Sequence, residues 1–224
     1  MSGRDAILGR VRRALGADSD DAMRLQAVEK RLARPPKGVI PARGQGSAAE
    51  KLHLFCTEAE AVHATLVKVR GPEGVPAAVA AYLRAKNLPA ELRMGSDRRL
   101  KAMPWQRQRS LTVRYGASDG DDLTGVSHAF AGIAETGSVV LHSGADNPTT
   151  VNFLPEHHIV VIEAKDIVGD LETALGRVRR KFGRGEMPRT VNMITGPSRS
   201  ADIEQRLLLG AHGPRSLHLI VVEG

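Results

Sequence analysis

The sequence of 224 residues contains a single cysteine, Cys56. One thiol excludes a disulfide bond within the chain, and it excludes an iron–sulfur cluster held by this chain alone, because such clusters need several thiolates. Cys56 follows Leu54 and Phe55, and we expect it to pack as a small apolar side chain rather than to act as a nucleophile. No cofactor is therefore expected to be bound through cysteines of this chain.

Long apolar runs are also missing. The longest, residues 159–162 and 217–222, are far shorter than the about 20 residues that a helix needs to cross a bilayer. The N-terminus does not combine a basic start with an apolar segment, as a secretory signal peptide does. These two absences predict a cytoplasmic protein without a membrane span.

Aromatic residues make up only 3% of the chain, so the stacking platforms that bind single-stranded nucleic acid are scarce. Positive charge is abundant, since the formal net charge is +7. Residues 1–45 contain ten lysines and arginines against five acidic residues, so most of the excess lies in the N-terminal segment. We expect this segment to dock on a partner or to aid solubility, and we rank nucleic acid below both.

Standard catalytic and metal-binding signatures are absent. The chain has no G-x-S-x-G elbow, no G-x-x-x-x-G-K-[ST] loop and no G-x-G-x-x-G turn. His157 and His158 are adjacent, so on a strand they face opposite sides and cannot share an ion, and the other histidines follow no recognised ligand spacing. We predict no metal site, and we expect His157, which follows Pro155 and Glu156, to orient a turn.

What is present begins with a helical pattern near the N-terminus. Apolar residues recur at helical spacing over residues 4–15, and a second helix is expected over residues 22–32, after the acidic segment 18–21. The Pro- and Gly-rich segment 35–46 is typical of a linker. The sequence therefore predicts two parts, a basic helical arm with its linker over residues 1–40 and a main domain over residues 41–224. Because an amphipathic helix outside a core usually packs on something, a partner protein or a second copy of the chain is expected to cover the arm.

Beyond residue 47, helical and strand patterns alternate. Helices are expected over residues 48–57, 75–85 and 167–182, and strands over residues 65–69, 92–94, 111–115, 138–141, 159–162, 191–194 and 217–222. Short, uninterrupted apolar strands between helices indicate a mostly parallel sheet with helices on both faces. The predicted fold class is α/β.

Ligands of open α/β sheets bind beyond the carboxyl ends of the strands, and three glycine-containing loops are candidates for such a site. In the first, Gly137 lets the backbone approach a ligand while Thr136 and Ser138 offer hydroxyls beside Glu135. A tight turn whose hydroxyls satisfy local backbone groups explains this loop equally well.

The second loop follows the strand at residues 191–194. Thr195 and Gly196 open a turn, Ser198 or Ser200 is placed to cap a following helix, and Arg199 supplies a planar cation. Helix N–H groups and a guanidinium at one spot favour a carboxylate or phosphate. The alternative is an ordinary capped helix, in which an acidic residue of the first turn already complements the helix dipole.

The third loop, residues 210–214, holds His212 between two glycines and ahead of the last strand. An imidazole at a sheet edge is suited to contact a substrate, although a single loop histidine is more often structural.

Four segments resemble, in their order along the chain, the motif series of the lactate utilization protein C family, the LUD domain proteins. The resemblance runs from about residue 120 to the C-terminus. The segments are Ala134-Glu135-Thr136-Gly137-Ser138, Leu154-Pro155-Glu156-His157-His158, Thr195-Gly196-Pro197-Ser198-Arg199-Ser200-Ala201-Asp202-Ile203-Glu204 and Gly210-Ala211-His212-Gly213-Pro214.

The resemblance implies a fold like that of the sugar-phosphate isomerase and coenzyme A transferase group. It also implies a role in oxidising L-lactate to pyruvate together with partner proteins that carry iron–sulfur clusters. The single cysteine of this chain agrees with that division of labour.

Three hypotheses about function follow. In the first, the chain binds a small anion, either a 2-hydroxy or 2-keto carboxylate or a phosphorylated cofactor fragment. Arg199 and helix N–H groups would hold this anion, Thr136 and Ser138 would position it, and His212 would bond its hydroxyl or keto oxygen. In the second, the chain is an autonomous isomerase or transferase with Glu135 as nucleophile or base. In the third, it is an interaction module whose basic arm docks an iron–sulfur partner.

Overall fold

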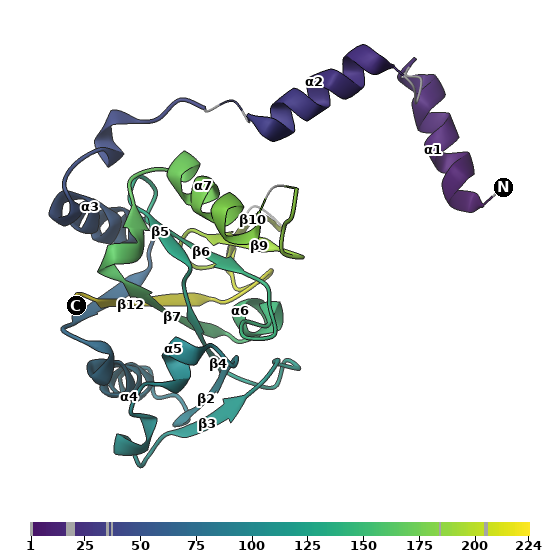
Figure 1. The fold of residues 1–224 in the computed structure, drawn as a ribbon. Helices are drawn as coiled ribbons and strands as arrows, with labels where there is room; N and C mark the ends of the chain where they lie inside the picture. The colour runs from purple at the N-terminus through teal and green to yellow at the C-terminus, as the bar shows by residue number, and fades with distance from the viewer. Residues whose placement is uncertain (1, 17–20, 35, 37, 184, 204–205) are drawn as a thin grey trace.

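The computed structural model describes residues 2–16, 21–34, 36, 38–183, 185–203 and 206–224 (Figure 1). Its centre is a six-stranded sheet in which every neighbouring pair of strands is parallel. In spatial order, the strands are β1 (Thr65–Val69), β12 (Ser216–Val222), β7 (His157–Glu163), β4 (Thr124–His128), β2 (Glu91–Met94) and β3 (Thr112–Tyr115). The α/β class and the mostly parallel sheet are confirmed.

A second sheet of four strands packs on the first. Its order is β8 (Ile167–Val168), β5 (Ala131–Ile133), β6 (Ser138–His142) and β9 (Val191–Ile194), with β6 antiparallel to both of its neighbours. The strands predicted over residues 138–141 and 191–194 therefore exist, but they belong to this sheet and not to the parallel one.

Helices cover both faces of the parallel sheet (Figure 1). The helices of this part of the chain are α3 (Ala48–Ala61), α4 (Val75–Ala85), α5 (Arg98–Lys101), α6 (Thr149–Phe153) and α7 (Leu171–Phe182), with short 3-10 turns η1 (Ala42–Gly44), η2 (Pro72–Gly74), η3 (Trp105–Arg107) and η4 (Ala164–Asp166). The helix predicted over residues 167–182 begins late, because residues 167–168 pair in a sheet and the Asp170 side chain caps the helix through the Thr173 N–H at 2.8 Å.

Successive side chains of the central strand β7 point into two different hydrophobic cores. Val160 and Ile162 of β7 pack against α3 and the second sheet, whereas Ile159 and Val161 pack against α4 and α5 on the other face. Cys56 of α3 lies in the first of these cores, as expected, and burial raises the pKa of its thiol. A third cluster joins the second sheet to α7.

The N-terminal segment forms two helices, α1 (Gly3–Ala14) and α2 (Ala22–Ala33), close to the predicted positions. Neither helix has a buried residue, and Figure 1 shows both extending away from the sheets. Residues 18–20 of the predicted helix start, and Pro35 and Lys37 of the predicted linker, lie outside the described residues. No helix within the described ranges is long and apolar enough to cross a membrane. The division of the chain near residue 40 stays a prediction.

Residues 38–45 of the predicted linker are bound to the main domain. The Gly38 N–H donates to the Glu172 carboxylate at 3.0 Å, and the Gln45 amide donates to Asp170 at 3.0 Å. Gly44 is buried so close to Gly169 that a Cβ on Gly44 would lie 2.2 Å from the Gly169 carbonyl oxygen. Residues 38–45 are thus fastened to the start of α7.

The prediction of a helix after residue 198 is wrong. The chain forms a two-stranded antiparallel hairpin of β10 (Arg199–Ile203) and β11 (Arg206–Leu209). Its base is closed by the Gly210 N–H, which donates to the Ser198 carbonyl at 3.0 Å. Ser198 and Ser200 therefore cap no helix, and Glu204 lies outside the described residues.

Candidate functional site

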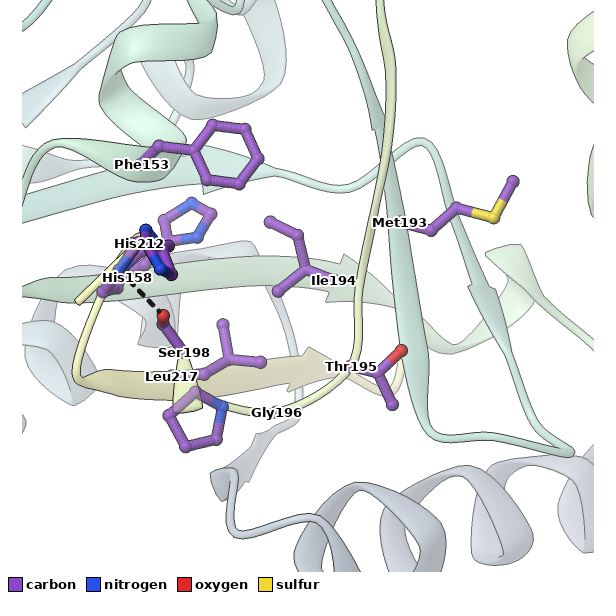
Figure 2. A pocket seen from close by; sticks show the side chains of 12 residues that line it. Phe153, His158, Met193, Ile194, Thr195, Gly196, Ser198, His212 and Leu217 are labelled. Carbon is purple, nitrogen blue, oxygen red and sulfur yellow. Dashed lines mark hydrogen bonds between the residues drawn. The ribbon is translucent and has the colours of Figure 1, made fainter. Parts of the chain in front are cut away.

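A pocket of about 200 Å³ lies where the end of β9 meets the starts of β7 and β12 (Figure 2). We call it the two-histidine pocket, because His158 of β7 and His212 of the third predicted loop both line it. Its other lining residues are Phe153, Met193, Ile194, Thr195, Gly196, Pro197, Ser198, Gly213, Pro214 and Leu217. The structure thus brings the second and third predicted loops together, at the amino ends of parallel strands and not at the carboxyl ends we expected.

Two hydrogen bonds hold these loops against each other. The Ser198 N–H donates to the Pro214 carbonyl at 2.8 Å, and the His212 N–H donates to the Ser198 Oγ at 3.4 Å (Figure 2). Because the Ser198 Oγ accepts here, its own proton is left to donate to a ligand. The His212 side chain is exposed at the mouth of the pocket.

Gly196 and Arg199 hold the turn in place. Gly196 has a φ of +72°, and a Cβ added to it would lie 2.2 Å from the Val62 carbonyl oxygen. The Arg199 guanidinium donates to the same oxygen at 2.9 Å and does not line the pocket. The predicted anion cradle of Arg199 and helix N–H groups is therefore corrected, because β10 replaces the helix and the guanidinium braces the turn.

The first predicted loop reaches the pocket only through a chain of hydroxyls. The Thr136 Oγ1 lies 2.8 Å from the Ser138 Oγ, which lies 2.5 Å from the Thr195 Oγ1 on the pocket wall. Gly137 has a φ of +63°, and a Cβ there would meet the Ala59 backbone nitrogen at 2.2 Å. Gly137 therefore serves close packing against α3.

Glu135 of the same loop points elsewhere. It is buried, and its carboxylate accepts the Leu171 N–H at 2.9 Å, at the first residue of α7. A carboxylate at this position complements the positive end of the helix dipole. Its backbone carbonyl accepts a bond from Arg43. Glu135 does not line the two-histidine pocket, and its role as nucleophile or base stays a prediction.

His158 is the polar pocket residue that the sequence analysis did not predict. Its side chain is fully buried, and its Nε2 lies 3.1 Å from the Ser127 Oγ, which in turn donates to the Asn152 Oδ1 at 2.6 Å. Burial lowers the pKa of His158 to about 3, so the ring is neutral at physiological pH. The neighbouring His157 faces the other side of the sheet, as predicted, where its Nδ1 lies 2.9 Å from the Tyr82 hydroxyl. Alternation along a strand separates the two rings but does not tell which of them borders a cavity.

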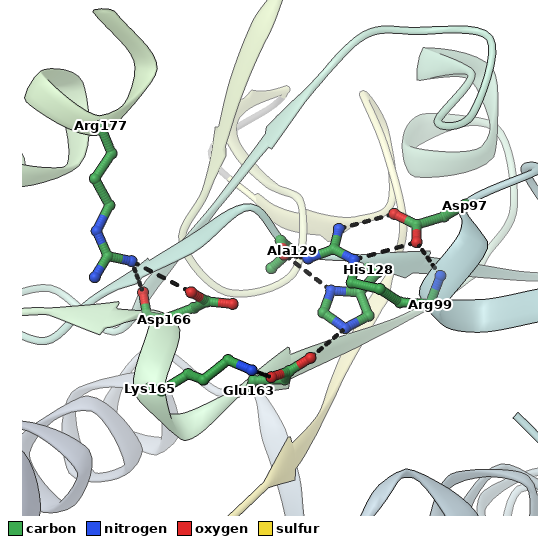
Figure 3. Close-up of polar contacts among 8 residues, drawn as sticks. All are labelled: Asp97, Arg99, His128, Ala129, Glu163, Lys165, Asp166 and Arg177. Carbon is green, nitrogen blue, oxygen red and sulfur yellow. Dashed lines mark hydrogen bonds and ion pairs between the residues drawn. The ribbon is translucent and has the colours of Figure 1, made fainter. Parts of the chain in front are cut away.

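The carboxyl ends of the parallel strands carry a different arrangement (Figure 3). Arg99 makes two bonds to the Asp97 carboxylate, at 3.2 and 2.8 Å. The His128 Nδ1 lies 2.9 Å from the Ala129 carbonyl, and its Nε2 lies 4.0 Å from the Glu163 carboxylate. Burial, and then the charge of Arg99, lowers the pKa of His128. Glu163 also pairs with Lys165, so the charges here are matched to one another.

Among the residues that the structure describes, no group of three or more histidine, cysteine, aspartate or glutamate side chains is arranged to hold a metal ion.

The parallel sheet, the smaller sheet packed on it and the helices outside both define an α/β domain of two stacked sheets. The chain belongs to the LUD domain family, whose model matches residues 56–222.

Curated relatives carry the name lactate utilization protein C. The protein from Geobacillus sp. (strain WCH70) is 40% identical over 99 residues, which cover 44% of this chain and 41% of that protein. The protein from Bacillus licheniformis is 34% identical over 128 residues, which cover 53% of each. The matched part of the chain thus spans about half the length of these relatives, or less.

The crystal structure of a DUF162 family protein from Deinococcus radiodurans superposes with a TM-score of 0.59 at 22% identity. The match covers 79% of this chain and 99% of that chain. The two proteins share the fold.

Proposed function

We propose that the protein is a component of L-lactate utilization and binds a small carboxylate in the two-histidine pocket. The names of the curated relatives support the pathway. The observation that carries the site is the pocket itself, which joins three of the four segments through which the sequence resembles its family. Its volume of about 200 Å³ suits a molecule of a few heavy atoms.

The walls of the pocket divide by chemistry. Phe153, Ile194 and Leu217 provide an apolar surface that suits the methyl group of lactate or pyruvate. The hydroxyl of the half-buried Ser198 and the exposed His212 imidazole are suited to a carboxylate. A carboxylate held beside the exposed His212 keeps part of its hydration, which limits the cost of binding it without a buried cation.

Calorimetric titration of L-lactate, pyruvate and coenzyme A into the full chain tests the site. We expect Ser198→Ala to weaken binding of the small carboxylate by about 3- to 10-fold, the effect of one hydrogen bond. Ser110→Ala, at an exposed position before β3, is the matched control and should bind as the wild type does. Equal binding by both variants would remove Ser198 from the site, and absence of binding by the wild type would refute the proposal.

We further propose that α1 and α2 dock the iron–sulfur partners of the pathway. Both helices carry basic residues and expose apolar side chains, among them Ile7 of α1 at 65% and Met23 of α2 at 83%. The test is co-purification of a cluster-binding protein encoded beside this chain, with and without residues 1–40. Deletion is expected to abolish the iron that co-purifies and to leave the titration with lactate unchanged. Iron that still co-purifies after the deletion would place the docking surface elsewhere.

A further inference from the structure

We propose that His158 binds the ligand of the two-histidine pocket as a hydrogen-bond acceptor, and so makes the pocket select a hydroxyl group over a carbonyl group. The inference rests on the proposed function, since it concerns the same pocket and the same class of small carboxylate. It adds the identity of the selecting atom, the Nδ1 of His158, and the form of ligand that this atom favours, a 2-hydroxy acid.

The orientation of the Asn152 amide, with its Oδ1 towards Ser127, implies one tautomer of the ring. The single hydroxyl proton of Ser127 is donated to the Asn152 Oδ1 at 2.6 Å. The Ser127 Oγ can therefore only accept from the His158 Nε2, which lies 3.1 Å away. A neutral imidazole carries one proton, and in His158 that proton is on Nε2. The Nδ1 consequently carries a lone pair.

The Nδ1 has no other use within the described part of the chain. It is buried, and no hydrogen-bond donor among the described residues reaches it. The ring lines the pocket together with Phe153, Leu217 and His212 (Figure 2). A buried acceptor without a partner is costly, and a donor brought in by a ligand removes that cost.

The lone pair on the Nδ1 is expected to make the pocket prefer a 2-hydroxy acid over the 2-keto acid with the same carbon skeleton. The hydroxyl of a 2-hydroxy acid can donate its proton to the Nδ1. The keto oxygen of a 2-keto acid has only lone pairs, which repel the lone pair of the Nδ1. The ring is neutral and so adds no attraction for the carboxylate, which leaves the carboxylate to Ser198 and His212 and the hydroxyl to His158.

Two substitutions separate this role from a structural one. His158→Gln places an amide near the Nε2 position and keeps the bond to Ser127 but removes the acceptor at Nδ1. His158→Asn places a carbonyl oxygen near the Nδ1 position and keeps the acceptor. L-lactate, pyruvate and propionate are titrated into the wild type and both variants, and thermal unfolding shows which variants are folded.

We expect the wild type to bind lactate at least about 10-fold more tightly than pyruvate or propionate, from one hydrogen bond gained and one repulsion avoided. His158→Gln should reduce this preference to within about 3-fold, and His158→Asn should restore part of it. A purely structural role of His158 would weaken all three ligands together and leave their ratio unchanged, which would overturn the inference.

A measurement on the wild type alone decides the matter if a variant does not fold. Long-range ¹H–¹⁵N spectra should show His158 protonated at Nε2, with an Nδ1 resonance that moves on addition of lactate and not of propionate. A ring protonated at Nδ1, or equal affinity of the wild type for lactate and pyruvate, would refute the selection by His158 and leave the pocket as a carboxylate site. If none of the three ligands binds, the inference and the proposed function both fall.

Discussion

The two ends of the parallel strands each hold a buried histidine, and the two histidines have opposite surroundings. At the carboxyl ends, His128 lies among Asp97, Arg99 and Glu163, whose charges are paired with one another. At the amino ends, His158 borders a mostly apolar pocket. Each of the two rings makes one hydrogen bond and leaves one buried nitrogen without a partner among the described residues. The two rings differ in what faces them: the unbonded Nε2 of His128 lies 4.0 Å from the Glu163 carboxylate, whereas the His158 ring borders a pocket. The comparison therefore favours the amino ends, against the usual position of ligands in open α/β sheets.

The largest effect is expected at the amino ends from Gly196→Ala. A side chain at a φ of +72°, 2.2 Å from a backbone oxygen, forces the turn away from Val62. We expect a loss of about 3 kcal/mol in the free energy of unfolding together with loss of lactate binding. Urea denaturation and titration measure the two effects. Gly213→Ala, whose added carbon would meet its neighbours at 3.6 Å, should cost little stability, and a similar loss in both variants would contradict the role of the turn.

At the carboxyl ends, Asp97→Ala should lower stability by about 2 kcal/mol, because it removes both bonds to Arg99 and the cap of α5. Lactate binding should be unchanged, and a loss of binding would break the comparison. Burial of Asp97 raises its pKa, but the bonds and charge of Arg99 outweigh burial and the net pKa is lowered. Its stabilising effect is therefore present above about pH 4 and is lost as the pH falls further. Asp146→Ala is the control, because Asp146 is exposed and lines a surface hollow together with Asp97.

Ser127→Ala sharpens the comparison behind the pocket. The variant deprives the His158 N–H of its acceptor, so stability should fall by about 1 kcal/mol and the ring is no longer fixed in one tautomer. We expect the preference for lactate over pyruvate to shrink. Ser118→Ala removes a buried hydroxyl that donates to Asp122 at 2.8 Å, and it should lower stability without changing that preference. An unchanged preference in Ser127→Ala would show that Ser127 does not set the tautomer.

The smallest effect is expected from Glu135→Gln, which lies at neither end of the parallel strands. The amide still accepts the Leu171 N–H but no longer carries a charge at the start of α7, so a loss of about 0.5 kcal/mol is expected. Lactate binding should be unchanged. Turnover of an acyl-coenzyme A or a sugar phosphate by the isolated wild type, abolished in this variant, would instead establish Glu135 as the nucleophile or base of an enzyme.

Most helices and strands could be predicted from local sequence patterns, but the pairing of the strands could not. The apolar runs at residues 159–162 and 217–222 identified β7 and β12. The runs that form β6 and β9 looked the same, and only pairing between distant segments places them in the second sheet. β4 was missed because Thr124–His128 carries a glycine and polar residues, although the fold buries all five positions.

The site was also predicted only in part, because its turns follow from local residues whereas its hairpin depends on strand pairing. The glycines at 137, 196 and 210 marked tight turns, and all three have a positive φ. The hairpin after residue 198 was mistaken for a helix, because serines followed by an acidic residue are also typical of a helix start. Its strands are specified by pairing with each other.

Because residues 38–45 are bound to the start of α7, they limit how far α2 can lie from the main domain. The chain between the end of α2 at Ala33 and the Glu172 contact of Gly38 can span at most about 18 Å, even when fully extended. A protein docked on α2 is therefore kept beside the start of α7, as on a short tether. A partner protein bound to α2 would therefore lie on the side of the molecule where the smaller sheet lies.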